Sequence, residues 1–158
     1  MNVQYVVARL LDESATLEEA APKILQAVGE SLDCEFGELW AAHRRTRALQ
    51  FVTGWHKPTA EAGRFEAASR EFAFEPGVGL PGRIWATGEP LWVPDLSQDF
   101  DFQRQQLAAE AGLRSAFGFP IELEGEPLGV MLFLGRDIRE PDAGLLRLFR
   151  AVSEQISQ

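Results

Sequence analysis

The spacing of apolar residues predicts helices at both ends of the chain. Residues 3–11 repeat apolar positions at helical intervals, and a second amphipathic helix follows Thr16, which forms a capping-box pattern with Glu19 and extends to about Leu32. A last helix is predicted from about residue 141. Its apolar residues are spaced by four, three and four: Leu145, Phe149, Val152 and Ile156.

Between these helices the pattern becomes that of strands. Residues 34–43 and 48–55 are rich in aromatic and β-branched residues and predict a hairpin closed by an arginine-rich turn at Arg44, Arg45 and Arg47. Residues 57–70 are polar or small and are interpreted as a loop. Residues 71–76 alternate polar with apolar and predict a third strand.

The second half of the chain predicts a short helix followed by a short strand. The helix covers residues 80–87, with Pro81 in its first turn and Gly88 at its C-terminal cap. Residues 90–95 carry a proline near each end, which predicts a short strand that either lies at the edge of a sheet or is broken.

A further helix and a second hairpin complete the predicted elements. The helix covers residues 97–111, with Asp99 or Asp101 as its N-cap. Two apolar runs then flank Glu124 and Gly125, a pair that favours a tight hairpin turn.

This order of elements predicts an α+β domain built on a central antiparallel sheet of about six strands. Neither face of the predicted strands is consistently polar, so both faces are expected to be covered. The terminal helices are expected on one face, and the short helices and loops on the other. Residues 1–158 contain no repeat or low-complexity linker and are interpreted as a single domain.

Charge and cysteine content exclude several classes of function. The chain has 24 acidic and 15 basic residues, and its net charge of -9 argues against binding nucleic acid. The single cysteine, Cys34, excludes an internal disulfide and a multi-cysteine zinc site, and no metal site is expected. The sequence shows neither a signal-peptide pattern nor a membrane span, so a cytoplasmic protein is expected.

Residues 77–82 spell G-x-G-x-x-G, a pattern found in dinucleotide-binding proteins. Such a site requires a buried parallel strand before the glycines and a long crossover helix after them. Here Gly88 ends the helix early, and Pro81 lacks a backbone N–H that could bind phosphate. The glycines are therefore interpreted as residues that let the chain turn tightly into a short helix.

Two segments resemble the GAF domain family in the order and spacing of their residues. They are GVGLPGRIWATGEPLWVPDLSQDFDF from Gly77 and AAEAGLRSAFGFPIELEGEPLGVMLFL from Ala108. The resemblance extends over nearly the whole chain. It implies a GAF-like fold and a non-catalytic sensory module in signal transduction, linked to an effector such as a histidine kinase of a two-component system, a diguanylate cyclase or a phosphodiesterase.

The resemblance also says which cofactors to look for. Bilin attachment needs a cysteine, and residues 95–115 have none. The two histidines, His43 and His56, are expected at a turn and a strand end and not as haem ligands. The only asparagine is Asn2, so the cyclic-nucleotide signature of the family is missing. No cofactor is therefore expected.

One enzymatic class of GAF domain, the free methionine sulfoxide reductases, resolves a sulfenic acid with a second thiol. A chain with one cysteine does not support that cycle. No nucleophile–base pair or paired acids stand out elsewhere in the sequence, so no enzyme activity is expected.

The space between the sheet and the short helices is expected to hold either an unknown small molecule or a second hydrophobic core. Asp95 and Arg114 are the candidate polar anchors. The candidate lining is apolar: Phe72, Phe74, Ile84, Trp85, Trp92, Phe102, Leu107, Phe117 and Phe119.

The terminal helices provide a second functional prediction. The last helix continues almost to Gln158 without a stop signal, so we expect it to pass into an effector domain of a longer protein. A homodimer through the first and last helices is predicted. Two alternatives remain open: the apolar residues of the last helix only pack against the sheet, or the chain is a purely structural homodimerisation domain without a ligand.

Overall fold

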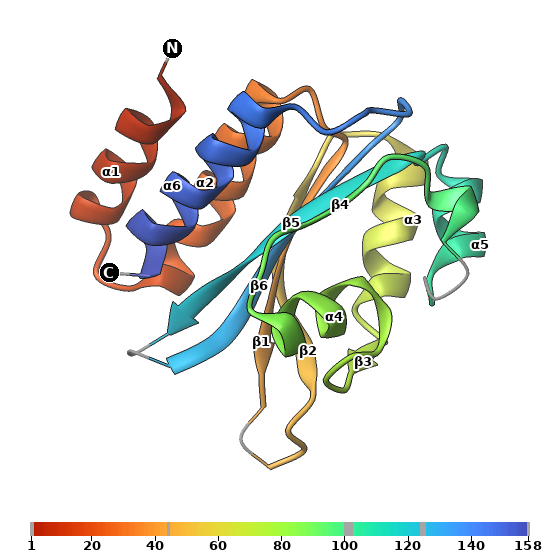
Figure 1. The fold of residues 1–158 in the computed structure, drawn as a ribbon, viewed down its shortest axis with the longest axis horizontal. Helices are drawn as coiled ribbons and strands as arrows, with labels where there is room; N and C mark the ends of the chain where they lie inside the picture. The colour runs from red at the N-terminus through yellow and green to blue at the C-terminus, as the bar shows by residue number, and fades with distance from the viewer. Residues whose placement is uncertain (1, 44, 100–102, 124–125, 158) are drawn as a thin grey trace.

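A six-stranded antiparallel sheet lies at the centre of the molecule, with helices on both faces (Figure 1). The computed structural model describes residues 2–43, 45–99, 103–123 and 126–157. The strands are β1 (Phe36–Ala42), β2 (Leu49–His56), β3 (Ala73–Phe74), β4 (Leu91–Val93), β5 (Ser115–Leu123) and β6 (Glu126–Gly135). They lie side by side in the order β3-β2-β1-β6-β5-β4. The predicted fold class is confirmed, and β4 is an edge strand, which is one of the two outcomes predicted for it.

The helices form two layers of different character. The longer ones lie together over one face of the sheet: α1 (Val3–Glu13), α2 (Leu17–Ser31) and α6 (Ala143–Ser157). The shorter ones lie over the other face: α3 (Ala60–Ser69), α4 (Gly79–Thr87) and α5 (Gln105–Glu110), with the 3₁₀ turn η1 (Leu96–Gln98) before α5. Within the described ranges, none of these helices combines the length and apolarity that crossing a bilayer requires.

The predicted helix caps are present. The Thr16 hydroxyl accepts a hydrogen bond from the Glu19 amide at 3.1 Å, and the Glu19 carboxylate accepts one from the Ala15 amide at 3.2 Å. At the end of α4, Gly88 adopts the left-handed conformation with φ 68°, and its N–H donates to the Ile84 carbonyl at 2.9 Å. These local contacts fix where α2 begins and where α4 ends.

Strand side chains alternate between the two faces of the sheet and create two separate cores. The terminal-helix core lies beneath α1, α2 and α6 and includes Ile24, Leu25, Phe117, Phe119, Phe133 and Phe149. The short-helix core lies beneath α3, α4 and α5 and includes Trp40, Phe65, Phe74, Leu80, Ile84 and Leu132.

The predicted loop over residues 57–70 is wrong, because most of that segment is α3. Thr59 caps this helix by accepting a hydrogen bond from the Ala62 amide at 3.1 Å. Ala62, Phe65 and Ser69 form its buried side. Two of these three residues are small, so the helical repeat of large apolar residues is weak in the sequence. The alanines of the segment nevertheless favour a helix strongly.

Two further elements differ from their predicted bounds. The strand over residues 71–76 pairs with β2 only through Ala73 and Phe74. The helix over residues 97–111 is divided, since the Asp95 carboxylate accepts a hydrogen bond from the Ser97 amide at 3.0 Å and starts η1 instead.

The helical part of that segment, α5, has Arg104 at its N-cap and not Asp99, which ends η1. The other predicted cap, Asp101, lies outside the described residues. So do Arg44 of the first turn and Glu124 and Gly125 of the second hairpin turn.

The apolar residues of α6 face the sheet of their own molecule. Phe149, Val152 and Ile156 are buried in the terminal-helix core, and Leu145 is half-buried against it. Of the two interpretations left open for these residues, packing against the sheet is the one observed. A homodimer stays a prediction, and the buried Phe149, Val152 and Ile156 are not available to it.

Candidate functional site

A buried ion pair lies at the centre of the short-helix core. It joins Glu38 on β1 to Arg104 at the N-cap of α5, and each residue is 1% exposed. The Arg104 Nη1 donates to the Glu38 Oε2 at 2.6 Å. Because neither group is open to solvent, their attraction is little screened by salt.

Three aromatic rings surround the Arg104 guanidinium. Its Cζ lies 5.2 Å from the ring centroid of Trp40, 5.2 Å from that of Phe65 and 5.7 Å from that of Phe74. These distances are typical of cation–π contacts. We call Trp40, Phe65 and Phe74 the aromatic box.

Further hydrogen bonds hold the charged groups in place. The Trp40 Nε1 donates to the Glu38 Oε1 at 3.0 Å, so both carboxylate oxygens of Glu38 are bonded. The Arg104 Nη1 also donates to the Ser69 Oγ at 2.9 Å. The pair is therefore part of a network that joins β1, α3 and the start of α5.

Local sequence positions the members of this network. Glu38 and Trp40 are two residues apart on β1 and so share one face of the sheet, while Phe65 and Ser69 are four apart on α3 and share one side of that helix. Sequence reasoning did not single out any of these four residues. The available signal was an acidic residue, Glu38, within the otherwise apolar run Phe36–Ala42.

The glycines of the G-x-G-x-x-G segment let α4 pack closely against this core. Gly79 has φ 67°, and a Cβ at this position would lie 2.6 Å from the Phe74 ring. A Cβ on Gly82 would collide with the Glu75 carbonyl oxygen. The strand before the segment, β3, is antiparallel to its neighbour β2 and has two residues. The segment therefore lacks the frame of a dinucleotide site, and its glycines serve backbone geometry.

The structure divides the predicted pocket lining between the two faces of the sheet. The short-helix core brings together Phe72, Phe74, Ile84, Trp85 and Leu107. Phe102 lies outside the described residues.

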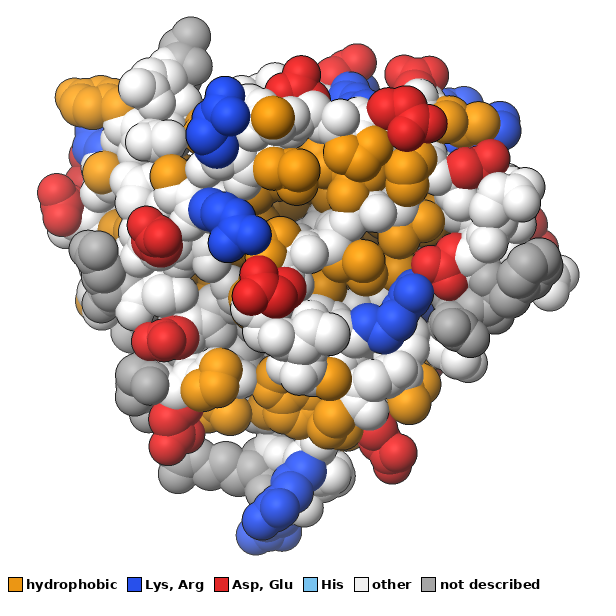
Figure 2. Space-filling view, viewed as in Figure 1, with side chains coloured by type: hydrophobic (Ala, Val, Ile, Leu, Met, Phe, Trp, Pro, Cys, Tyr) orange, Lys and Arg blue, Asp and Glu red, His pale blue; other side chains and the backbone are white. Residues whose placement is uncertain are grey.

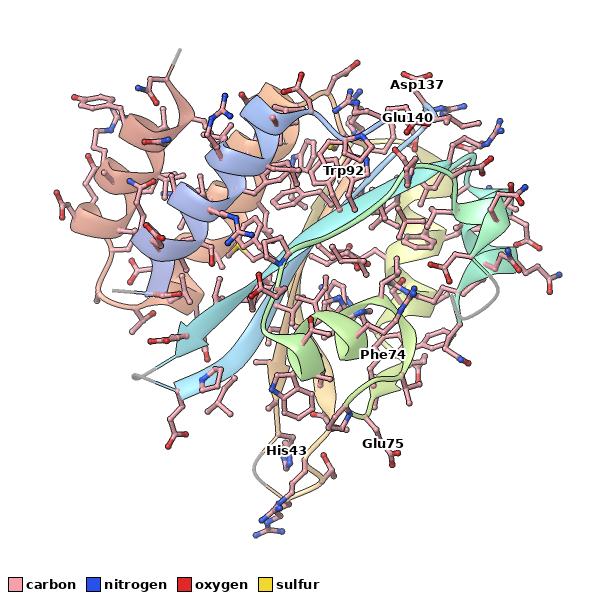
Figure 3. All side chains as sticks on the ribbon, in the orientation of Figure 1. His43, Phe74, Glu75, Trp92, Asp137 and Glu140 are labelled. Atoms are coloured by element: carbon pink, nitrogen blue, oxygen red, sulfur yellow. The ribbon has the colours of Figure 1, made fainter. Side chains whose placement is uncertain are left out.

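Trp92, Phe117 and Phe119 lie instead in the terminal-helix core, so the predicted single lining is corrected. The ring centroids of Trp92 and Phe117 are 4.8 Å apart, and those of Phe117 and Phe149 are 4.7 Å apart. Strand alternation is the reason, because Trp92 is directly opposite Phe117 in the β4–β5 register and both point to one face. Figure 3 shows Trp92 toward α6 and Phe74 on β3.

The predicted polar anchors lie near the surface and not in the short-helix core. The Asp95 carboxylate accepts hydrogen bonds from the Ser97 amide at 3.0 Å and the Ser97 hydroxyl at 2.7 Å. The hydroxyl bond is the main cause that holds the pKa of Asp95 below its ordinary value, and the Arg114 charge acts in the same direction. Arg114 itself is exposed.

Two open grooves on the surface are lined in part by predicted site residues. A groove of about 620 Å³ follows β4 and is lined by Leu91, Trp92, Pro94 and Asp95, among others. Figure 2 shows hydrophobic side chains around a hollow on this face. A groove of about 910 Å³ lies at the β1–β2 turn and is lined by residues that include His43, Glu75 and Trp85, the first two of which are labelled in Figure 3.

The histidines lie away from the ion pair. His43 is exposed, and the His56 Nε2 lies 3.2 Å from the Glu66 Oε2 at the partly exposed contact between β2 and α3. In the part of the chain that the structure describes, no three His, Cys, Asp or Glu side chains are grouped so that they could hold a metal ion.

Cys34 is buried beneath the terminal helices, where it is 1% exposed. Burial is the main cause that raises the pKa of its thiol from the ordinary 9.0 to about 12. Thiolates and not thiols are the nucleophiles in thiol chemistry, so burial and the raised pKa both disfavour reaction of Cys34 in the folded protein.

We therefore expect Cys34 to react with a disulfide reagent at pH 8 only when the protein opens, far more slowly than in urea. Equal reaction rates of Cys34 in the native and unfolded states would contradict the burial.

The raised pKa of the Cys34 thiol also affects stability. Its contribution to the free energy of unfolding is present below pH 9 and is lost as the pH rises toward 12. Urea unfolding of wild type and Cys34→Ala at pH 8 and at pH 10 measures this loss.

Comparison with known proteins decides the family. The family model described as GAF domain matches residues 14–158. The chain belongs to the GAF domain family. The Nif-specific regulatory proteins of Azospirillum lipoferum and Azospirillum brasilense are each 27% identical over 130 residues, which is 80% of this chain and 20% of theirs. The chain thus spans about a fifth of the length of these curated relatives.

Solved GAF-fold structures share the architecture of this chain. The free methionine-R-sulfoxide reductase of Neisseria meningitidis, in complex with its substrate, superposes with a TM-score of 0.78 at 14% identity, covering 98% of this GAF domain and 84% of the reductase chain. The A. aeolicus NLH2 GAF domain in an inactive state gives a TM-score of 0.68 at 19% identity, and the match covers 99% of this chain and 87% of the NLH2 chain. At these identities the likeness shows the fold alone, and the fold occurs in an enzyme as well.

Proposed function

We propose that this GAF domain is a non-catalytic sensory module of a longer cytoplasmic signalling protein, and that it binds a small molecule in the short-helix core. The Glu38–Arg104 pair in its aromatic box is the observation that carries the proposal. Burying two charges costs several kcal/mol, and apolar residues would fill a purely structural core equally well. The regulatory names of the Azospirillum relatives support the regulatory part of this proposal.

The sheet offers a route from this core to the terminal helices. Ser153 of α6 donates to the Pro120 carbonyl of β5 at 2.5 Å, and Ser157 accepts from the Glu122 amide at 2.9 Å. The Gln155 Nε2 donates to the Gln4 carbonyl of α1 at 3.0 Å. A displacement of β5 would therefore reach both α6 and α1, and through them a linked effector domain.

The opposite side of β5 contacts the short helices. A Cβ on Gly118 would lie 2.6 Å from the Met131 carbonyl oxygen and 2.9 Å from the Ile84 Cδ1 of α4. The absence of a side chain at Gly118 thus lets α4 press directly on β5. This contact supports the proposal that a change in the short-helix core moves β5.

The chemistry of Cys34 supports a non-catalytic role. A sulfoxide reductase of the thiol type needs an accessible thiolate. The thiol of Cys34 has a raised pKa and lies in the terminal-helix core, on the opposite face of the sheet from the ion pair.

A second candidate function is a structural dimerisation domain without a ligand. One observation favours it: the short-helix core is already occupied by the Arg104 side chain. Candidate residues for the dimer surface are Tyr5 of α1, which is 65% exposed, and the half-buried Leu145, Leu146 and Leu148 of α6, since Phe149, Val152 and Ile156 face inward.

A thermal-shift screen with amino acids, amines, small carboxylates and cyclic nucleotides separates the two functions. We expect at least one compound to raise the Tm of the wild type and to lose that effect in Glu38→Gln. Failure of every compound, together with a dimeric mass by light scattering, would favour the structural domain. A shift that persists in Glu38→Gln would place the ligand outside the short-helix core.

A further inference from the structure

We propose that Glu38 and the aromatic box form a recognition site for an organic cation, and that Arg104 occupies this site as a tethered ligand in the ligand-free protein. The inference rests on the proposed small-molecule function of the same core. It adds the chemical class of the ligand, which carries a guanidinium or ammonium group on an alkyl arm.

The box has the chemistry by which proteins recognise such cations. A carboxylate accepts the charge-assisted hydrogen bond at 2.6 Å, and three rings lie within 6 Å of the guanidinium carbon. Arg83 offers a comparison, because its pair with Asp99 also measures 2.6 Å but its side chain is 27% exposed. The burial of Arg104 among rings separates its site from a surface ion pair.

The box is built without any contribution from α5. Glu38 and Trp40 come from β1, Phe65 from α3 and Phe74 from β3. The Trp40 and Phe74 rings meet edge-on at 4.9 Å, and the Trp40 indole is bonded to Glu38. These contacts keep the site in shape when the guanidinium leaves it.

Arg104 reaches the aromatic box from the start of α5, which is less firmly packed than the elements that carry the box. The helix α5 has six residues, of which Ala108 alone is buried. Arg104 precedes this helix, so a shift of one short element withdraws the guanidinium. A neutral or anionic occupant would leave the buried Glu38 carboxylate without a counter-charge, which is unfavourable.

Chemical rescue of Arg104→Ala tests the site, with n-propylguanidinium as the probe and the neutral n-propylurea as its matched control. At roughly ten times its Kd we expect the cation to raise the Tm of the variant by about 3–6 °C and propylurea to have a much smaller effect. The wild type, in which Arg104 holds the site, and Arg83→Ala, which leaves the box intact, should both shift less than Arg104→Ala.

Equal shifts with propylurea, or an equal shift in the wild type, would overturn the proposal. If Arg104→Ala does not fold alone, recovery of its helical circular dichroism with the cation, but not with propylurea, is the supporting result. If it stays unfolded with both, Arg104→Gln is measured, because its neutral side chain leaves the box without a cation, and a propylguanidinium shift no larger than that of wild type overturns the proposal. A hit in the wild-type screen would still uphold the proposed function after such a failure.

Discussion

Replacing Glu38 with leucine is expected to lower the free energy of unfolding by about 3–5 kcal/mol, because the Arg104 guanidinium would stay buried without its carboxylate. The substitution removes the bond at 2.6 Å to Arg104 and the acceptor of the Trp40 indole N–H. Urea unfolding followed by tryptophan fluorescence and by circular dichroism measures the loss.

Two variants serve as controls for Glu38→Leu. The double variant Glu38→Leu/Arg104→Leu should recover most of the lost stability, since an apolar pair can replace a buried ion pair without a large penalty. Glu35→Leu, which breaks the partly exposed pair with Lys57 at 3.1 Å, should change stability by about 1 kcal/mol or less. A double variant as unstable as Glu38→Leu would contradict this account of the pair.

Phe149→Ala is expected to cost about 3–5 kcal/mol, because it removes the largest buried side chain of α6 and leaves a cavity. The Phe149 ring lies 4.7 Å from Phe117, 5.8 Å from Trp92 and 6.1 Å from Phe119 between ring centroids. Its loss should also weaken the attachment of α6 to the sheet. Urea unfolding gives the stability, and hydrogen exchange of the α6 amides shows whether the helix loosens.

The neighbouring Arg150→Ala is the matched control on the same helix. Arg150 is exposed, and its ion pair with Glu89 is 3.6 Å long with both side chains 64% exposed. We expect its replacement to change stability by about 0.5 kcal/mol or less. Similar losses for Arg150→Ala and Phe149→Ala would show that the aromatic stack does not anchor α6.

The elements that were predicted correctly are those with strong local signals. The capping pair Thr16 and Glu19 marks the start of α2, and Gly88 marks the end of α4. Helix α3 was missed because its buried face depends on Ala62 and Ser69, which carry almost no hydrophobic signal. A helix with so small an apolar face becomes visible only through its packing against the sheet.

The candidate site was harder to predict than the fold, because it depends on contacts between distant residues. Arg104 stands in a polar run, and nothing near it in sequence shows that it pairs with Glu38, 66 residues earlier. The division of the predicted lining has a simpler cause. Trp92 and Phe117 are opposite each other on paired strands and so share a face of the sheet, and that face is the opposite one from Phe74.

The position of β1 beside β6 has a consequence for how the chain folds. Their register pairs Phe36 with Leu134 and Trp40 with Val130, so the middle of the sheet joins the first third of the sequence to the last. The β1–β2 and β5–β6 hairpins can form early from local contacts, whereas this central seam must close a loop of most of the chain. During synthesis on the ribosome, the inner edge of β1 therefore stays open until β6 has emerged, and that interval is when the nascent protein is most exposed to aggregation.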